Sequence, residues 1–253
     1  MNFRGPAVWL GSAVVLLLII GLWQLGSNAG VIPQAFFPGP DRTFETLSDQ
    51  LWTEEFWLAF SETIRRMFFG FVLASVLGVA LGAALGSSAT LREFLEPTLE
   101  LIRPLPASAV IPVFVLMFGL NERMIVAVIA FGSVWPALLG TVHGFKTVEP
   151  RLYEVSRILK LSRLEMIWKI ALPNSLPDIF AGLRLALTVS LILAVVTEML
   201  SGADGLGHNI ILAARSFRSA DLFAGIIVLG AIGYLTNAVL ERVERHVLRW
   251  RNA

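Results

Sequence analysis

Few side chains in this sequence are placed to do covalent chemistry or to hold a metal ion. There is no cysteine, and neither His143 nor His208 has a second histidine or a paired carboxylate at a metal-ligand spacing. Ser133 and His143 could supply a nucleophile and a base, but ten residues of helix would separate them by about 15 Å. The Gly-x-Ser-x-Gly sequence of many serine hydrolases is absent. We therefore expect no catalytic residues and no metal site.

Charges at helical spacing offer a different chemistry, the docking of a partner. Pro150 can begin a helix, and after it Glu154, Arg157 and Lys160 recur at three-residue steps while apolar residues fill another side. Such a short amphipathic helix suits a groove on a soluble partner protein. A helix lying on lipid headgroups would show the same pattern, so the residues alone leave both interpretations open.

Two further charges, Arg184 and Glu198, lie within one apolar run. Ionised side chains inside a membrane are costly and often functional. We expect Glu198 to shape an outer gate or a contact between subunits, and Arg184 to contact an anionic substrate. Because both residues lie near the ends of the run, snorkelling to water is the structural alternative for each. Pro112 interrupts another apolar run and is a further candidate for the pathway.

The elements that carry these residues are those of a membrane protein. Of 253 residues, 56% are apolar and only 15% are charged, against about 25% charged residues in average soluble chains. The 20 Lys and Arg residues are balanced by 19 Asp and Glu residues, which leaves no basic field for nucleic acid. This composition excludes a soluble enzyme, a disordered chain and a nucleic-acid-binding protein.

Six apolar runs predict six transmembrane helices. The first run could be a signal peptide, but it is longer than the roughly 7–15 apolar residues of such a segment, so we expect a retained helix. Prolines in Arg103-Pro104-Leu105-Pro106 and at Pro112 are expected to break or kink the third run. The predicted spans are Val8–Leu25, Ile64–Leu85, Pro106–Leu120 with the stretch from Phe94 leading into it, Met124–Val142, Ile179–Leu200 and Leu222–Leu240.

The distribution of Lys and Arg favours one orientation. Six of them lie in 144–175 and four follow residue 241, whereas 28–62 has one arginine and six acidic residues. With six spans, both termini and the 144–175 loop are then cytoplasmic. After the Pro38-Gly39-Pro40 turn, the outer loop is predicted to hold an amphipathic interfacial helix, with a solvated connector as the alternative. Its apolar residues are Phe44, Leu47, Leu51 and Leu58.

Small residues form a stripe in the second apolar run. Gly78, Gly82 and Gly86 recur every four residues and so lie on one face of a helix. Such a stripe lets a second helix approach closely. We expect it to be a helix-packing surface, with a pore lining as the alternative.

The loop that carries Glu154 resembles the EAA loop of binding-protein-dependent ABC transporter permeases, which reads Glu-Ala-Ala, three residues, Gly, nine residues, Ile-x-Leu-Pro. Glu154 matches the Glu, and Ile170-Ala171-Leu172-Pro173 falls at the required spacing. Val155 and Ser156 stand for the two alanines, and Lys160 stands for the glycine.

The resemblance runs from about Phe37 to Trp250 and is strongest to the sulfonate/taurine/nitrate branch of these permeases. Sequences that carry it include Arg103-Pro104-x-Pro106, Phe118-Gly119, Ala181-Gly182-Leu183-Arg184 and Gly205-Leu206-Gly207. It implies an all-α membrane protein with six transmembrane helices and the type I, MetI-like importer fold. It also implies a homodimer in the bacterial inner membrane, working with two ATPase subunits and a periplasmic binding protein.

In this family the EAA helix couples the permease to the ATPase. The resemblance therefore implies that the ATPase contacts are Glu154, Val155, Ser156, Arg157, Leu159, Lys160 and Leu161. The chain has no Gly-rich phosphate loop ending in Lys-Ser or Lys-Thr, so ATP and Mg would be held by the partner and this chain would carry no cofactor. We divide the chain into 1–60, the first span with the outer amphipathic segment, and 61–253, the permease core with its coupling loop at about 150–173.

The predicted function is the permease subunit of an ATP-driven importer. Its substrate is expected to be a small organic anion, an aliphatic sulfonate or taurine first, with nitrate or bicarbonate and vitamin-precursor heterocycles as alternatives. A self-sufficient carrier or channel is more remote, because inverted halves are not evident and the charged cytoplasmic helix would have no role.

Overall fold

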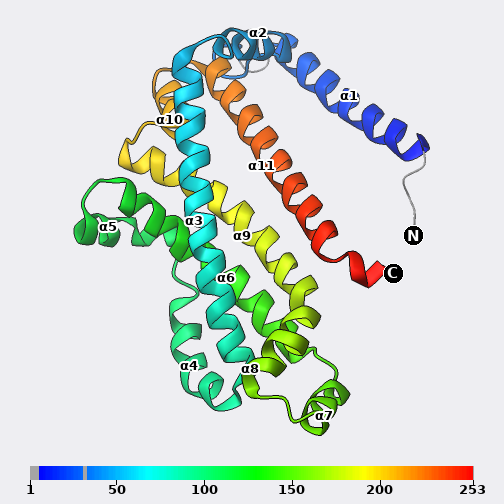
Figure 1. The fold of residues 1–253 in the computed structure, drawn as a ribbon. Helices are drawn as coiled ribbons and strands as arrows, with labels where there is room; N and C mark the ends of the chain where they lie inside the picture. Colours follow the sequence, from blue (N-terminus) through cyan, green and yellow to red (C-terminus); the bar gives the residue numbers. More distant parts are fainter. Residues whose placement is uncertain (1–5, 31–32, 253) are drawn as a thin grey trace.

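The computed structural model describes residues 6–30 and 33–252, and every regular element in that part of the chain is helical. α2 and α10 lie at one end of the bundle and α7 lies at the other (Figure 1). The helices are α1 (Pro6–Asn28), α2 (Pro40–Gln50), α3 (Glu54–Ser87), α4 (Ala89–Ile102), α5 (Ala107–Phe118), α6 (Glu122–Lys146), α7 (Pro150–Ile158), α8 (Arg163–Met166), the π-helical turn η1 (Ile167–Ala171), α9 (Leu172–Ser201), α10 (Leu206–Arg215), α11 (Ser219–Val247) and the 3-10 turn η2 (Arg249–Asn252).

The six predicted spans correspond to five long apolar helices and one bent pair. Among the described residues, α1 from Leu10, α3, α6, α8 through α9, and α11 are each long and apolar enough to cross a membrane. The pair α4 and α5 passes the same test only together, and its halves are bent by 95°. The predicted break at 103–106 is confirmed. Pro112 does not end α5, which continues to Phe118, although its ring nitrogen can donate no hydrogen bond to the Ser108 carbonyl.

α3, α6 and α9 pack against each other through glycines and form the core of the bundle (Figure 1). A Cβ added to Gly82 of α3 would lie 2.6 Å from Thr141 Cβ and 2.8 Å from the Leu138 carbonyl oxygen of α6. A Cβ on Gly140 of α6 would lie 2.9 Å from the Cα of Gly182 in α9. The helix backbones are therefore in contact, which only residues without a side chain allow.

The segment 144–175, expected to be cytoplasmic, is largely helical. α6 continues to Lys146, α7 follows, and from Arg163 helical structure runs without a break to Ser201. The predicted span Ile179–Leu200 lies inside this longer helical stretch of 39 residues. Pro173 is accommodated because the residue four positions earlier, Lys169, lies in η1, where the wider π turn removes the clash with the ring.

α1 leans away from the bundle and joins it near its C-terminal end (Figure 1). There the Trp23 indole nitrogen donates a hydrogen bond to the Pro38 carbonyl oxygen at 2.9 Å, and the Trp23 ring stacks on Phe223 at 5.7 Å. The predicted outer helix is α2, which ends before Leu51, so Leu58 lies in α3. The domain boundary expected at 60/61 falls inside the continuous helix α3.

Candidate functional site

The segment expected to meet an ATPase lies at the end of the bundle opposite α2 and α10 (Figure 1). Pro150 starts α7, as expected for a residue with no amide hydrogen to lose. At its C-terminus, the Leu161 amide donates to the Ser156 carbonyl and the Lys160 amide donates to the Arg157 carbonyl, both at 3.0 Å. These two bonds define a Schellman motif, and Lys160 occupies its left-handed position with a φ of 48°. The glycine of the EAA pattern falls at this position, where glycine has no steric cost.

The seven residues expected to contact the ATPase are mostly exposed. Ser156 is buried and Leu161 is half-buried, whereas the exposed members are Glu154, Val155, Arg157, Leu159 and Lys160. Large apolar side chains are exposed beside them, including Ile158 and Trp168 at 79% and 67%. This end of the bundle therefore presents charges together with an apolar surface, a combination typical of a protein-binding site.

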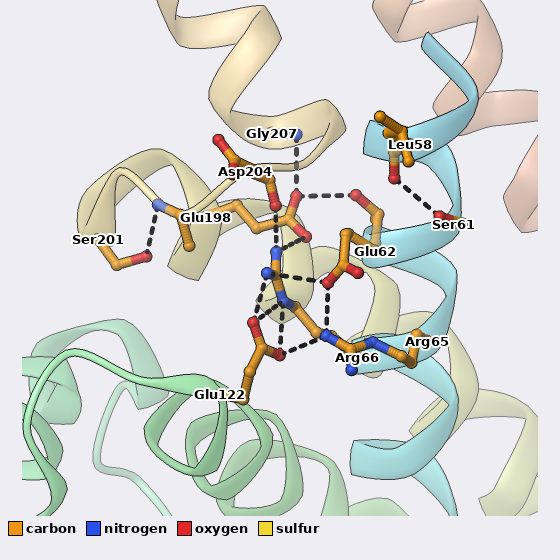
Figure 2. Close-up of polar contacts among 12 residues, drawn as sticks. Leu58, Ser61, Glu62, Arg65, Arg66, Glu122, Glu198, Ser201, Asp204 and Gly207 are labelled. Carbon is orange, nitrogen blue, oxygen red and sulfur yellow. Dashed lines mark hydrogen bonds and ion pairs between the residues drawn. The ribbon is translucent and has the colours of Figure 1, made fainter. Parts of the chain in front are cut away.

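A buried ionic cluster lies nearer the other end and joins α3, α6 and α9 (Figure 2). Its centre is Arg66, whose side chain is 4% exposed. The guanidinium holds Glu122 at two points, Nη2 to Oε1 at 2.6 Å and Nε to Oε2 at 3.0 Å. Its Nη1 donates to Glu198 Oε1 at 3.1 Å, and Glu198 is completely buried. One guanidinium thus ties three helices together.

The loop between α9 and α10 completes the shell around Glu198 (Figure 2). Glu198 Oε2 accepts hydrogen bonds from Thr63 Oγ1 at 2.9 Å and from the Gly207 amide at 3.0 Å. Arg66 Nη1 also donates to the Asp204 carbonyl oxygen. A Cβ on Gly205 would lie 2.3 Å from the Glu198 carboxyl carbon, so the loop backbone closes directly over the charge. A carboxylate in this position is tolerated because donors meet both of its oxygens.

The structure separates the residues that the sequence suggested for a pathway or gate. Glu198 does not snorkel to water, so that alternative is wrong. Arg184 lies 14 residues before Glu198 on α9, about 21 Å along the helix axis, and its half-exposed guanidinium pairs with Glu244 of α11. Pro112 is exposed on α5. Within the described ranges, no group of three His, Asp or Glu side chains is arranged to hold a metal ion.

Sequence reasoning missed Arg66 and Glu122, the two partners of Glu198. Arg66 directly precedes a stretch without charges that runs through the rest of α3 to Arg92 in α4, and Glu122 begins the apolar helix α6. Residues at the edges of two apolar runs lie at similar depth in a membrane. The opposite charges of Arg66 and Glu122 at similar depth could therefore have predicted an ion pair between them.

The glycine stripe of α3 faces α6 along its whole length. A Cβ added to Gly78 or Gly86 would come within 2.7 Å and 2.5 Å of α6 side chains, close to the 2.6 Å found at Gly82. The stripe is thus occupied by a helix of the same chain.

Comparison with known proteins places this architecture in a family. Residues 70–251 match the family described as "Binding-protein-dependent transport system inner membrane component". A permease protein of Bacillus subtilis (strain 168) named for aliphatic sulfonates transport is 32% identical, over 97% of this chain and 89% of the relative. The taurine transport system permease protein of Escherichia coli (strain K12) is 28% identical, over 98% and 90% of the two chains. The nitrate import permease protein of Leptolyngbya laminosa is 29% identical, over 97% and 94%.

Solved structures agree on the fold. The inward-facing MetNI methionine ABC transporter superposes with a TM-score of 0.66 at 18% identity, over 74% of this chain and 93% of that chain. An amino acid ABC transporter superposes with a TM-score of 0.61 at 18% identity, over 80% and 97%. Because the relatives are permease subunits, the chain is a transport subunit and not an enzyme in its own right. It belongs to the binding-protein-dependent transport system inner membrane component family, as a multi-pass ABC importer permease of the MetI-like fold within the sulfonate, taurine and nitrate branch.

Proposed function

We propose that the substrate of this permease is a small sulfonate anion, an aliphatic sulfonate or taurine. The observation that carries the proposal is the 32% identity to the Bacillus subtilis relative, whose name specifies aliphatic sulfonates, along nearly the whole chain. The Escherichia coli relative is named for taurine, which is also a sulfonate. Nitrate is the second candidate, since a relative of similar identity is named for its import.

The assembly that we propose contains two copies of this chain, two ATPase subunits and a periplasmic binding protein. A second copy is supported by α1, which leans away from its own bundle with exposed apolar side chains along its length, among them Leu16, Leu18 and Leu22. In a dimer, such an arm would be covered by the partner subunit as well as by lipid. The excess of Lys and Arg in 144–175 and after residue 241 supports cytoplasmic termini and a cytoplasmic α7.

We assign the ATPase contact to α7 and the residues that follow it. An ATPase cleft would cover the exposed apolar side chains of Ile158 and Leu159, and Glu154 and Arg157 lie one helical turn apart on the same short helix. Because α7 begins at a proline and ends in a Schellman motif, both of its ends are fixed, and it can transmit movement as a rigid helix.

The substrate is tested with the complete transporter in proteoliposomes. The permease is reconstituted with its ATPase and binding protein, and ATP hydrolysis is measured with taurine, an alkanesulfonate, nitrate or bicarbonate. We expect the two sulfonates to stimulate hydrolysis and to be taken up. Stimulation by nitrate or bicarbonate alone would transfer the assignment to the second candidate.

The coupling role is tested by the double substitution Glu154→Ala with Arg157→Ala. We expect loss of stimulated hydrolysis, and co-purification of the ATPase then distinguishes failed transmission from failed docking. The matched control is Arg42→Ala with Glu45→Ala, an exposed pair at the same spacing on α2. Normal stimulation in the α7 variant would mean that this helix is not the coupling element.

A further inference from the structure

A groove of about 610 Å³ runs between α3 and α6 below the ionic cluster. On α3 its walls follow the helical spacing i, i+3, i+4 and i+7, so they form one continuous stripe. The lining side chains below the cluster are all apolar: Phe69, Val72, Leu73, Val76, Val126 and Ala127. An apolar groove of this length needs an apolar occupant.

The upper rim of the groove carries three arginines, of which two are paired with carboxylates. It is lined by Arg65, Arg66 and Arg123 against one acidic residue, Glu122. Arg66 is engaged in the buried cluster by both Glu122 and Glu198. Arg65 is 49% exposed and contacts Glu62 and Glu122 at 2.5 and 3.2 Å. Arg123 is exposed, and its side chain makes no ion pair or hydrogen bond with any described residue. Among the described residues of the rim, Arg123 therefore has its guanidinium left for an anion, and Arg65 is exposed beside it.

The depth of the groove matches one leaflet of a membrane. Residues 67–85 of α3 contain no charged side chain and extend over about 28 Å, close to the roughly 30 Å of a bilayer hydrocarbon core. Arg65 and Arg66 thus lie at the boundary of that core on the side of α2. The rise from Arg65 to Val76 is about 16 Å, roughly half of the core. The groove begins at headgroup level and ends near the midplane.

We propose that this groove is a binding site for one anionic phospholipid of the leaflet on the α2 side. The phosphate accepts hydrogen bonds from Arg123 and from the exposed edge of Arg65, since arginine matches phosphate geometry. One acyl chain lies along Phe69, Val72 and Val76. A small water-soluble anion would occupy the rim alone and leave the apolar walls uncovered. A second copy of the chain would bury Arg123 and would have to supply an acidic partner for it.

The probe is phosphatidylglycerol, titrated onto the purified transporter in detergent and counted by native mass spectrometry. We expect Arg123→Gln to weaken its binding about fivefold, and the double variant with Arg65→Gln about 25-fold, from about 1 kcal/mol for each basic residue near a lipid headgroup. Ala127→Phe, which fills the groove without changing any charge, should also remove the bound lipid. Arg42→Gln on α2 is the matched control and should bind normally.

Three results would overturn the site. One is equal binding of phosphatidylglycerol by Arg123→Gln, by Ala127→Phe and by the unaltered transporter. Another is competition by a soluble anion: if glycerol phosphate or taurine displaces the bound lipid at concentrations as low as those at which added phosphatidylglycerol does, the rim would be assigned to a soluble anion. The last is an assembled transporter with no lipid bound, which would assign the groove to a second copy. Since lipid binding is measured without transport, these results do not depend on the substrate proposed above.

Discussion

Replacing Glu198 by glutamine keeps the size of the side chain and removes its charge. The carboxylate now accepts hydrogen bonds from Thr63 Oγ1 and the Gly207 amide on one oxygen and from Arg66 on the other. A glutamine amide has one acceptor oxygen and one donor nitrogen. Whichever way it is turned, its nitrogen meets a donor, and the backbone at Gly205 leaves no room for the amide to move aside.

The magnitude follows from the burial of the cluster. Removing one partner of a buried ion pair costs about 3–5 kcal/mol. Because Arg66 retains the bidentate contact with Glu122, we expect the lower end, about 3 kcal/mol. For a chain of this length, 1 kcal/mol shifts the melting temperature by about 2–4 °C, so the expected loss is roughly 6–12 °C.

The assay is thermal unfolding of the detergent-solubilised transporter, followed by the loss of the assembled peak in size-exclusion chromatography. Glu45→Gln, on the exposed side of α2, is the matched control, and we expect its melting temperature to change by less than about 2 °C. A second variant, Arg66→Gln, tests coupling: combined with Glu198→Gln, it should destabilise by less than the sum of the two single changes. Melting of Glu198→Gln within about 2 °C of the unaltered protein would refute the assignment of Glu198 as a charged, fully paired member of the cluster.

Three further predictions concern packing, the end of α7 and topology. Gly82→Leu should reduce the yield of assembled complex, because no side chain fits 2.6 Å from Thr141; a normal yield with altered transport would instead indicate a pore lining. Lys160→Gly should stabilise the end of α7 by up to about 1 kcal/mol, since the left-handed conformation costs other residues about 1–2 kcal/mol. Slower amide hydrogen exchange in α7 would show this stabilisation, whereas faster exchange would contradict the Schellman geometry. In this cysteine-free chain, a cysteine at Asp49 should react with an impermeant reagent from outside and one at Arg163 should not, and the reverse labelling would overturn the proposed orientation.

The helices could be predicted from the sequence because hydropathy and charge spacing are local properties. The apolar runs place α3, α6, α9 and α11, and Pro150 with the charges after it places α7. The effect of a proline on a helix was harder to predict, because it depends on more than the local sequence. A proline removes the hydrogen bond to the residue four positions before it, but whether the helix ends there depends on structure that the local pattern does not contain: α5 continues through Pro112, and a π turn precedes Pro173.

The ionic cluster was beyond local reasoning. Arg66, Glu122 and Glu198 belong to three helices, and each alone has the pattern of a charge near the end of a span. Only the packing of α3, α6 and α9 through their glycines brings the three side chains together. The depth of Arg66 and Glu122 could have suggested a pair, whereas the enclosure of Glu198 by the backbone of 204–207 is a tertiary feature.

The glycine contacts have a mechanical consequence. The backbones of α3 and α6 touch at Gly82, and those of α6 and α9 touch at Gly140. The three helices cannot slide past each other without a collision, so they must rotate together as one rigid unit. Flexing is then left to the irregular joints, the bend at 103–106 and the wide turn η1. α3 has 34 residues and is about 51 Å long, so a rotation of about 10° at one end moves the other end by about 9 Å. A small tilt imposed beside α7 would thereby become a large lateral displacement at the opposite membrane surface.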